Sequence, residues 1–445
     1  MPKTERRDER RFLYKQLAGY QREYTNLMRA QNFLQLSNVA IRGLTLVSKF
    51  LLIFFLARFL EPVELGIYGL LAATIGYSLY LLGFDFHTYS TRELLKRERC
   101  EWGGLLKAQG ALTLVLYVIF LPPLSLVFIK GLLPMRVIGW FFVLLILEHL
   151  TQELGRLLIT VSDQLFASLI LFFRSGVWAV LITGLMFIKP DTRNLDMVFG
   201  AWTLGAATAL FLGIYRVKRM GLSGWRQNID WAWIIKGLRV ASALLIATLA
   251  IRGVFTLDRY WFQDLAGLDV LGAYVLFMSI SMALMSFLDA GVFAFIYPGL
   301  ISAYQRRDPV GFHRGIRRLL LQTVGLCGAF SVVALVTIGP LLAWLGKPLY
   351  SEQQGLFVWI LFATVLYALC MIPHYGLYAQ GCDKPIIHSH LASLIIFILA
   401  TLGFAQTWPQ LAVPLGLCVS FFVVLCWKSW SFYRLTPVPY RLFQS

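Results

Sequence analysis

Long apolar stretches, repeated along the whole chain, constrain its fold more than any other feature. Runs of about 20 apolar residues recur twelve times, and about 20 such residues cross the ~30 Å hydrocarbon layer of a bilayer as a helix. Hydrophobic residues make up 58% of the chain and charged residues only 14%, whereas soluble domains are about one quarter charged. The sequence therefore predicts an all-α polytopic membrane protein. A transmembrane β-barrel is excluded because its strands alternate polar and apolar residues.

The apolar runs divide into two equal sets. We expect transmembrane helices at residues 36–58, 64–84, 105–128, 135–155, 164–188, 195–215, 235–257, 270–295, 319–343, 354–379, 386–404 and 410–432. A connection at 216–236, rich in Arg, Lys and Trp, separates the first six from the last six. The predicted parts are a cytoplasmic basic N-terminal segment (1–35), an N-lobe (36–215), an interfacial linker (216–234), a C-lobe (235–434) and a cytoplasmic tail (435–445). Within the first part, residues 9–30 fit either an amphipathic helix on the membrane surface or a solvated basic tail.

Lys and Arg are distributed unevenly between the two sides of the predicted membrane. With both termini on one side, the segments on that side hold 29 of the 40 Lys and Arg residues, and the opposite loops hold seven. Short loops rich in these residues stay in the cytoplasm, so both termini are predicted to be cytoplasmic. The same asymmetry explains the net charge of +17, and we expect no nucleic-acid partner.

Short motifs recur between the two halves. The second span begins with Glu64-Leu65-Gly66-Ile67-Tyr68, and the eighth begins with Val270-Leu271-Gly272-Ala273-Tyr274. Repeats of six spans have the same orientation in the membrane, so their pseudo-twofold axis runs along the membrane normal. The sequence therefore predicts two six-helix bundles related by this axis around a central cavity.

Four basic residues fall inside predicted spans, where an ionisable group costs several kcal/mol unless it faces water or a partner. They are Arg42, Lys49, Arg174 and Arg252. In the first span Asn38, Arg42, Thr45 and Lys49 lie within about 60° on one helix face. We predict that the four cations line one cavity and bind an anion. Snorkelling of Arg42 and Lys49, and buried ion pairs at Arg174 and Arg252, are the alternatives.

Acidic residues near the predicted cytoplasmic ends are candidates for gating or coupling. Glu148, Glu153 and Arg156 lie in the fourth span or directly after it, and Asp289 lies in the eighth. Glu153 and Arg156, three apart, fit either a helix-end ion pair or a proton relay. We expect His374 to be a packing residue and His390 an interfacial one.

Catalytic and metal-binding motifs are missing from the sequence. It contains no Walker loop, HExxH or GxSxG pattern, and the six cysteines are scattered without a CxxC pair. A metal site, a cofactor and a disulfide framework are therefore not expected. The connections are short, which leaves no room for a catalytic domain and argues against an enzyme.

A further set of motifs carries a family resemblance. In order along the chain they are Leu56-Ala57-Arg58-Phe59-Leu60, Glu64 to Tyr68, Gly83-Phe84-Asp85, Arg92, Asp258-Arg259-Tyr260, Leu271 to Tyr274, Asp289-Ala290-Gly291, Pro298, Gly339-Pro340-Leu341-Leu342, Gly381 and Lys384. Over residues 36–434 the chain resembles bacterial polysaccharide (O-antigen type) flippases, in the polysaccharide-transport branch of the multidrug/oligosaccharidyl-lipid/polysaccharide exporter superfamily. The long basic N-terminal extension and the final hairpin, Gly403 to Leu415, depart from the pattern of that family.

The resemblance implies a function. It implies a flippase of the bacterial inner membrane that moves an oligosaccharide on undecaprenyl pyrophosphate from the inner to the outer leaflet by alternating access. The cargo would be a repeat unit of a surface polysaccharide such as O-antigen or exopolysaccharide. Expected partners are this lipid-linked oligosaccharide and membrane lipids, with a polysaccharide polymerase and a chain-length regulator as candidate protein partners, and we expect a monomer. A proton gradient, another ion gradient or the membrane potential would drive the step.

Two other functions remain open. A cation/drug antiporter of the same superfamily would need a carboxylate buried in the first bundle, where the first span offers Arg42 and Lys49 instead. A membrane-embedded glycan polymerase or ligase would carry catalytic groups in a large outer loop, and the predicted outer loops are short.

Overall fold

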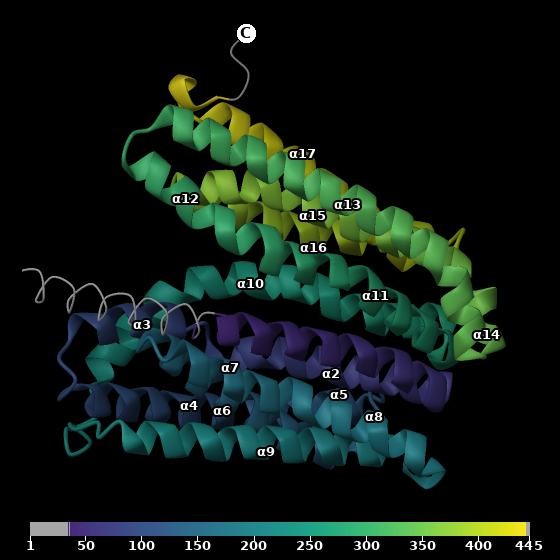
Figure 1. Cartoon of the computed structure of the whole chain (residues 1–445), viewed down its shortest axis with the longest axis horizontal. Coiled ribbons are helices and arrows are strands. Elements are labelled where there is room, and N and C mark those ends of the chain that lie inside the picture. Colours follow the sequence, from purple (N-terminus) through teal and green to yellow (C-terminus); the bar gives the residue numbers. More distant parts are fainter. Residues whose placement is uncertain (1–33, 35, 442–445) are drawn as a thin grey trace, which may run out of the picture.

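The structure is a computed structural model that describes residue 34 and residues 36–441. The described residues form helices and connections, with no strand among them. The predictions for residues 1–33, including the amphipathic helix at 9–30, lie outside the described part of the chain. Figure 1 shows two groups of long helices that converge near α14 and diverge toward α3 and α12.

The N-terminal group contains six spans. Eleven helices within the described residues are long and apolar enough to cross a membrane, and a bent helix in the second group brings the number to twelve. The N-terminal elements are the first helix (Leu36–Phe59), α2 (Pro62–Gly83), α3 (His87–Lys96), α4 (Trp102–Leu124), α5 (Leu126–Ile129), α6 (Ile138–Thr160), α7 (Gln164–Phe172), the π-helical turn η2 (Phe173–Val177), α8 (Trp178–Ile188) and α9 (Leu195–Arg219). Together, α7, η2 and α8 form one span.

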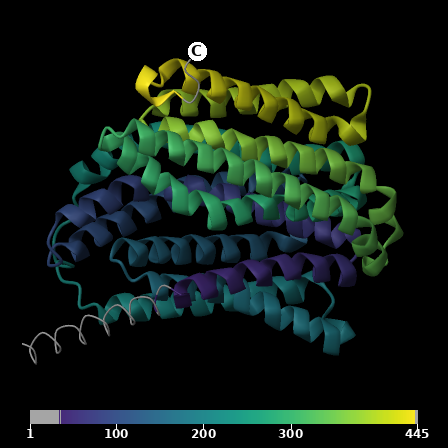
Figure 2. The same ribbon diagram turned by 45° about the horizontal axis from the view of Figure 1, so that its top comes forward.

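The C-terminal group repeats this arrangement. Its elements are α10 (Trp231–Ala266), α11 (Leu268–Leu288), the π-helical turn η4 (Asp289–Phe293), α12 (Ala294–Gln305), α13 (Pro309–Leu345), α14 (Pro348–Glu352), α15 (Gln354–Ala379), α16 (Asp383–Ala405) and α17 (Pro409–Leu435). α10 bends by 49° near its middle. Figure 2 shows that the helices of both groups run along one common direction. The two-bundle, all-helical architecture predicted from the sequence is confirmed.

The two groups meet tightly at one end of the bundle, which we call the closed end. Lys347 forms an ion pair with Glu61, with 2.7 Å between Nζ and Oε1. The guanidinium of Arg58 lies 4.3 Å from the ring centroid of Trp344. The repeated glycines lie here. A Cβ on Gly66 would come within 2.9 Å of the carbonyl oxygen of Leu268, and one on Gly272 would overlap the carbonyl of Pro62. The repeated motifs of the two halves therefore pack against each other through their glycines.

Helices extend beyond several predicted spans. The seventh was predicted to end at residue 257 but α10 continues to Ala266, and the ninth was predicted to begin at 319 but α13 begins at Pro309. Apolar runs mark the stretch inside hydrocarbon, whereas a helix can continue into water because its backbone hydrogen bonds stay satisfied. As a result Arg259, counted from the sequence in a loop, lies within α10.

Candidate functional site

A central cavity of about 450 Å³ lies between the two helix groups. The first helix, α2, α6, η2 and α9 form one wall, and α10 and α11 form the other. Its charged lining residues, among those described, are Lys49, Glu148, Arg174 and Arg259. Three cations therefore face one carboxylate in a hollow that two lobes share.

Glu148 and Arg174 form the best-defined contact in the cavity. Arg174 Nε donates to Glu148 Oε2 at 2.5 Å, and Trp202 Nε1 donates to Glu148 Oε1 at 2.7 Å. The carboxylate is buried and both of its oxygens are satisfied. Arg174 lies on the π-helical turn η2, a deviation that is frequent at functional sites because it redirects side chains. Trp178 Nε1 donates to the Arg174 carbonyl at 2.9 Å and helps to hold that turn.

Lys49 is the cation of the cavity that forms no ion pair among the described residues. It is exposed even though it lies in the interior of the bundle, because it projects into the hollow. An ammonium group in a membrane interior needs water or an anion near it. Lys49 is therefore the side chain most available to an incoming anionic group.

Arg259 enters the cavity from the C-terminal group. It forms an ion pair with the fully buried Asp258 at 3.0 Å, and the Tyr274 hydroxyl donates to Asp258 at 2.8 Å. The Nε of Arg259 is buried without a partner in the described structure. Tyr274 belongs to the repeated motif, so the motif also fixes a cavity residue. The sequence interpretation counted Arg259 in an outer loop, and so left it out of the cavity candidates, because the end of its span was placed too early.

The expectation that four cations share one cavity is wrong. Lys49 and Arg174 line the central cavity, but Arg252 lines a separate cavity of about 330 Å³ in the C-terminal group. Arg42 lines neither: its Nε donates to Ser168 Oγ at 2.9 Å, which ties the first helix to α7. The reason is their position along the helices: Arg42 and Arg252 each lie seven residues before a lining residue, Lys49 and Arg259, which is about 10 Å at 1.5 Å per residue.

The ion-pair alternative applies to Arg174 but not to Arg252. Arg174 is paired with Glu148. The guanidinium of Arg252 lies 5.2 Å from the ring centroid of Tyr80 on α2, a cation–π contact across the two helix groups, and it forms no ion pair among the described residues. Arg252 therefore stays available to a ligand in the C-terminal cavity.

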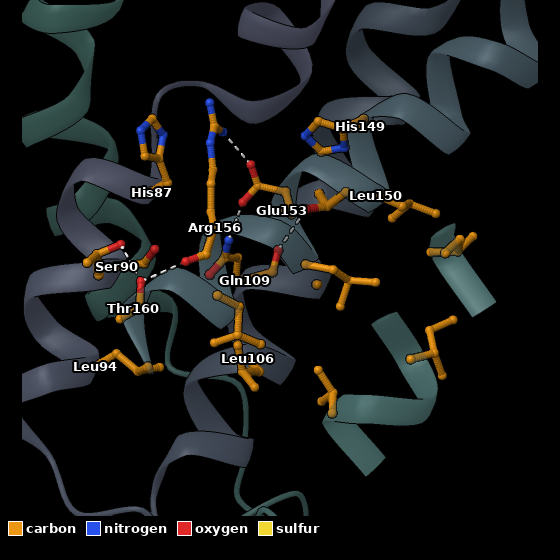
Figure 3. A pocket seen from close by; sticks show the side chains of 18 of the residues that line it. His87, Ser90, Leu94, Leu106, Gln109, His149, Leu150, Glu153, Arg156 and Thr160 are labelled. Atoms are coloured by element: carbon orange, nitrogen blue, oxygen red, sulfur yellow. Dashed lines mark hydrogen bonds and ion pairs between the residues drawn. The ribbon is translucent and has the colours of Figure 1, made fainter. Parts of the chain in front are cut away.

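Two of the four gating candidates, Glu153 and Arg156, line a third pocket of about 430 Å³ in the N-terminal group (Figure 3), whereas Glu148 lines the central cavity. Arg156 Nη1 donates to Glu153 Oε1 at 2.5 Å, and Gln109 Nε2 donates to Glu153 Oε2 at 2.8 Å. The helix-end ion pair is thus present. Nearby, Tyr117 and His149 share a hydrogen bond of 2.8 Å. Asp289 does not line this pocket; it begins the π-helical turn η4.

The chain is similar to known proteins in its structure and not in its sequence. No protein-family model and no curated protein matches the sequence. Solved structures do match. An inward-facing conformation of a multidrug resistance MATE family transporter of the MOP superfamily is 15% identical, with a TM-score of 0.73 over 90% of this chain and 98% of the other. An outward-facing MATE family transporter is 14% identical, with a TM-score of 0.56 over 90% and 95%.

A third match has the same architecture. The MATE transporter ClbM in complex with Rb+ is 14% identical, with a TM-score of 0.56 over 91% of this chain and 94% of the other. Identities this low establish the fold alone. The chain therefore has the two-bundle fold of MATE transporters in the MOP superfamily.

Proposed function

We propose that this chain is a flippase that moves a lipid-linked oligosaccharide bearing a pyrophosphate from the inner to the outer leaflet of a bacterial inner membrane. The observation that carries the proposal is the charge at the central cavity: Arg174 is paired with Glu148 and Arg259 with Asp258, and Lys49 adds a positive charge that no described carboxylate pairs with. A cavity with this excess of positive charge attracts anions. A guanidinium also offers two parallel donors to a phosphate. The solved structures of this fold are transporters, which favours transport over a polymerase or ligase.

The shape of the bundle supports alternating access. The helix groups join at the closed end through Glu61 and Lys347, and α12 diverges from α3 at the other end (Figure 1). The start of α10 stays packed against the N-terminal group there, through Trp233 and Phe86. That other end carries most of the basic residues, so the positive-inside rule assigns it to the cytoplasm. The greater similarity to an inward-facing transporter agrees with a cavity that receives cargo from the inner leaflet.

Reconstitution tests the proposal directly. The full-length protein is placed in vesicles with a fluorescent undecaprenyl-pyrophosphate oligosaccharide, and the fraction of probe exposed to an external quencher is followed with time. We expect the protein to speed exchange between leaflets, and Lys49→Met to slow it about tenfold or more because the free cation is lost. Lys96→Met, at an exposed site on α3, is the matched control. Equal rates with and without protein would refute the proposed cargo.

A cation/drug antiporter is the second candidate, and Glu148 favours it. The sequence argued against antiport because the first span carries Arg42 and Lys49 where a carboxylate would be needed, yet Glu148 of α6, in the N-terminal group, lies in the central cavity. Arg174 and Trp202 occupy both of its oxygens, however, which leaves it poorly placed to bind a cation. Uptake of a cationic dye by the same vesicles, lost in Glu148→Gln, would support antiport and contradict anion transport.

The driving force is a separate question. A pyrophosphate moving outward gains about 2.3 kcal/mol per charge per 100 mV of inside-negative potential, so the cargo can use the potential without a coupling ion. A proton on Glu148, Glu153 or Asp289 could still gate the cycle, and Glu153 is our first candidate because it lines the pocket near the open end. We expect Glu153→Gln to flatten the pH dependence of exchange in the vesicle assay. Unchanged pH dependence after amide replacement at all three sites would leave uniport as the mechanism.

A further inference from the structure

The cavity of about 330 Å³ within the C-terminal group has a cluster of basic side chains at its wall. Arg252, His374 and His390 line it, from α10, α15 and α16. Behind the two imidazoles lies Lys428 of α17, which is 1% exposed. Lys428 falls within the predicted span 410–432 but was counted among the cytoplasmic basic residues; in the structure it is buried within α17. Lys428, His374 and His390 each lie five to seven residues from the helix end that faces the open side of the bundle. At 1.5 Å per residue this is a depth of about 8–11 Å.

The cluster has a defined hydrogen-bond geometry. Lys428 Nζ lies 3.4 Å from His374 Nδ1 and 3.2 Å from His390 Nε2. The two rings are nearly parallel, at 7°, with centroids 6.0 Å apart. An ammonium group can only donate, so both of these ring nitrogens must accept and both imidazoles must be neutral while Lys428 is charged. His374 is hydrogen-bonded within the bundle, as expected, whereas His390, expected at an interface, contacts the same buried amine inside it.

No carboxylate of the described residues pairs with Lys428. Asp383 lines the same cavity but is exposed at the start of α16. The other ionisable groups at this cavity are Arg252 of α10 and Tyr367 and Tyr378 of α15, and the buried thiol of Cys370 also lies on α15. None of these four supplies a negative charge in its ordinary state, and the carboxylates of Asp85 and Asp289 act on Arg252 at longer range without pairing with it or with Lys428. A buried ammonium without a counter-charge is costly, and the cluster can relieve that cost by losing a proton or by gaining an anion in the adjoining cavity.

We propose that Lys428, His374 and His390 bind one proton between them, and that this proton strengthens the binding of a phosphate or pyrophosphate group in the cavity beside Arg252. The two imidazoles separate the buried amine from the cavity, so the proton reaches the amine through them. Linkage is reciprocal: an anion that binds more tightly to the protonated cluster also holds the proton more tightly. The proposal rests on the proposed function only for the identity of the anion.

Nitrogen NMR of the full-length protein, labelled with 15N-histidine in lipid, tests the proton site without any cargo. The chain has six histidines, and the variants His374→Gln and His390→Gln assign the two signals. We expect both rings to be neutral at pH 7 with one accepting nitrogen each, and to titrate together with Lys428. Lys428→Met, which keeps the side-chain volume, should return them to independent titration. Independent titration in the wild-type protein would overturn the proton site.

Calorimetry tests the link to the anion. The detergent-solubilised protein is titrated with pyrophosphate and, separately, with sulfate, a dianion that does not titrate near neutral pH. Repeating each titration in buffers of different ionisation enthalpy gives the number of protons taken up on binding. At pH values where the free cluster has largely lost its proton, we expect uptake of up to one proton per anion and up to about tenfold tighter sulfate binding per pH unit lowered; at lower pH both effects should level off. Lys428→Met should abolish both effects, whereas Lys384→Met, at an exposed site of the same lobe, should abolish neither.

The outcomes separate the two proposals. Anion binding without proton uptake, or proton uptake that survives in a folded Lys428→Met or His390→Gln protein, overturns the linkage and leaves the flippase proposal standing. If the wild-type protein binds neither pyrophosphate nor sulfate, both the linkage and the anionic cargo are refuted, and the NMR titration still decides whether the cluster is a proton site.

Discussion

Gly272→Ala is expected to prevent the two helix groups from meeting at the closed end. The added Cβ would overlap the backbone carbonyl of Pro62, and a backbone group at the start of α2 cannot rotate away as a side-chain tip can. Overpacking of this kind costs about 1–3 kcal/mol, which corresponds to about a 5–150-fold shift between two conformations. Gly66→Ala, whose Cβ would come within 2.9 Å of the Leu268 carbonyl, should act in the same direction more weakly.

Spin labels on the loops that follow α8 and α13 measure this effect as a distance distribution across the closed end. We expect Gly272→Ala to populate a longer distance and to slow transport, because a cavity open at both ends does not move its cargo in one direction. Gly328→Ala, in α13 with open space around its Cβ, is the matched control. An unchanged distance distribution in folded Gly272→Ala protein would show that the glycine contact does not hold the closed end.

Hydropathy and internal repeats were sufficient to predict the fold. Each apolar run became a helix, because a backbone in hydrocarbon must satisfy its own hydrogen bonds. The paired motifs around Gly66 and Gly272 even indicated where the halves are equivalent. Helix ends were less predictable. α10 and α13 continue outside the apolar runs, and the early end set for the seventh span placed Arg259 in a loop in the sequence interpretation.

The sequence identified most of the charged residues of the site, but not which of them lie together. Lys49 and Arg174 were recognised as interior charges and do line the central cavity. The position of Arg252 in a separate cavity and of Arg42 outside both depends on how the helices pack, which the residues of one helix do not report. The contact of Arg174 with Glu148 joins α6 to η2, and no local spacing in the sequence reports such a pairing. The cluster around Lys428 was missed for the same reason, since its three members come from three helices.

Arg174→Ala is expected to destabilise the protein by about 3–5 kcal/mol, because it leaves the Glu148 carboxylate buried without its cation. The pair lies at 2.5 Å, with side chains 18% and 7% exposed. Thermal unfolding in detergent measures the loss. The pair of Arg216 with Asp163, at 2.6 Å and with side chains 40% and 19% exposed, is the matched control. Arg216→Ala should cost about 1 kcal/mol or less because water can solvate the remaining carboxylate.

Variants that keep the bundle stable then show whether Arg174 is needed for transport as well as for stability. The double variant Glu148→Gln/Arg174→Gln removes both charges and should recover most of the lost stability, since no unpaired charge stays buried. If Arg174 binds the pyrophosphate, this variant stays inactive in the vesicle assay, whereas Arg174→Lys keeps part of the activity because it retains the charge but not the two-donor geometry. Full transport by the double variant would show that the pair only supports the bundle. Lys49 and Arg259 would then be the cations of the central cavity that remain to receive the anion.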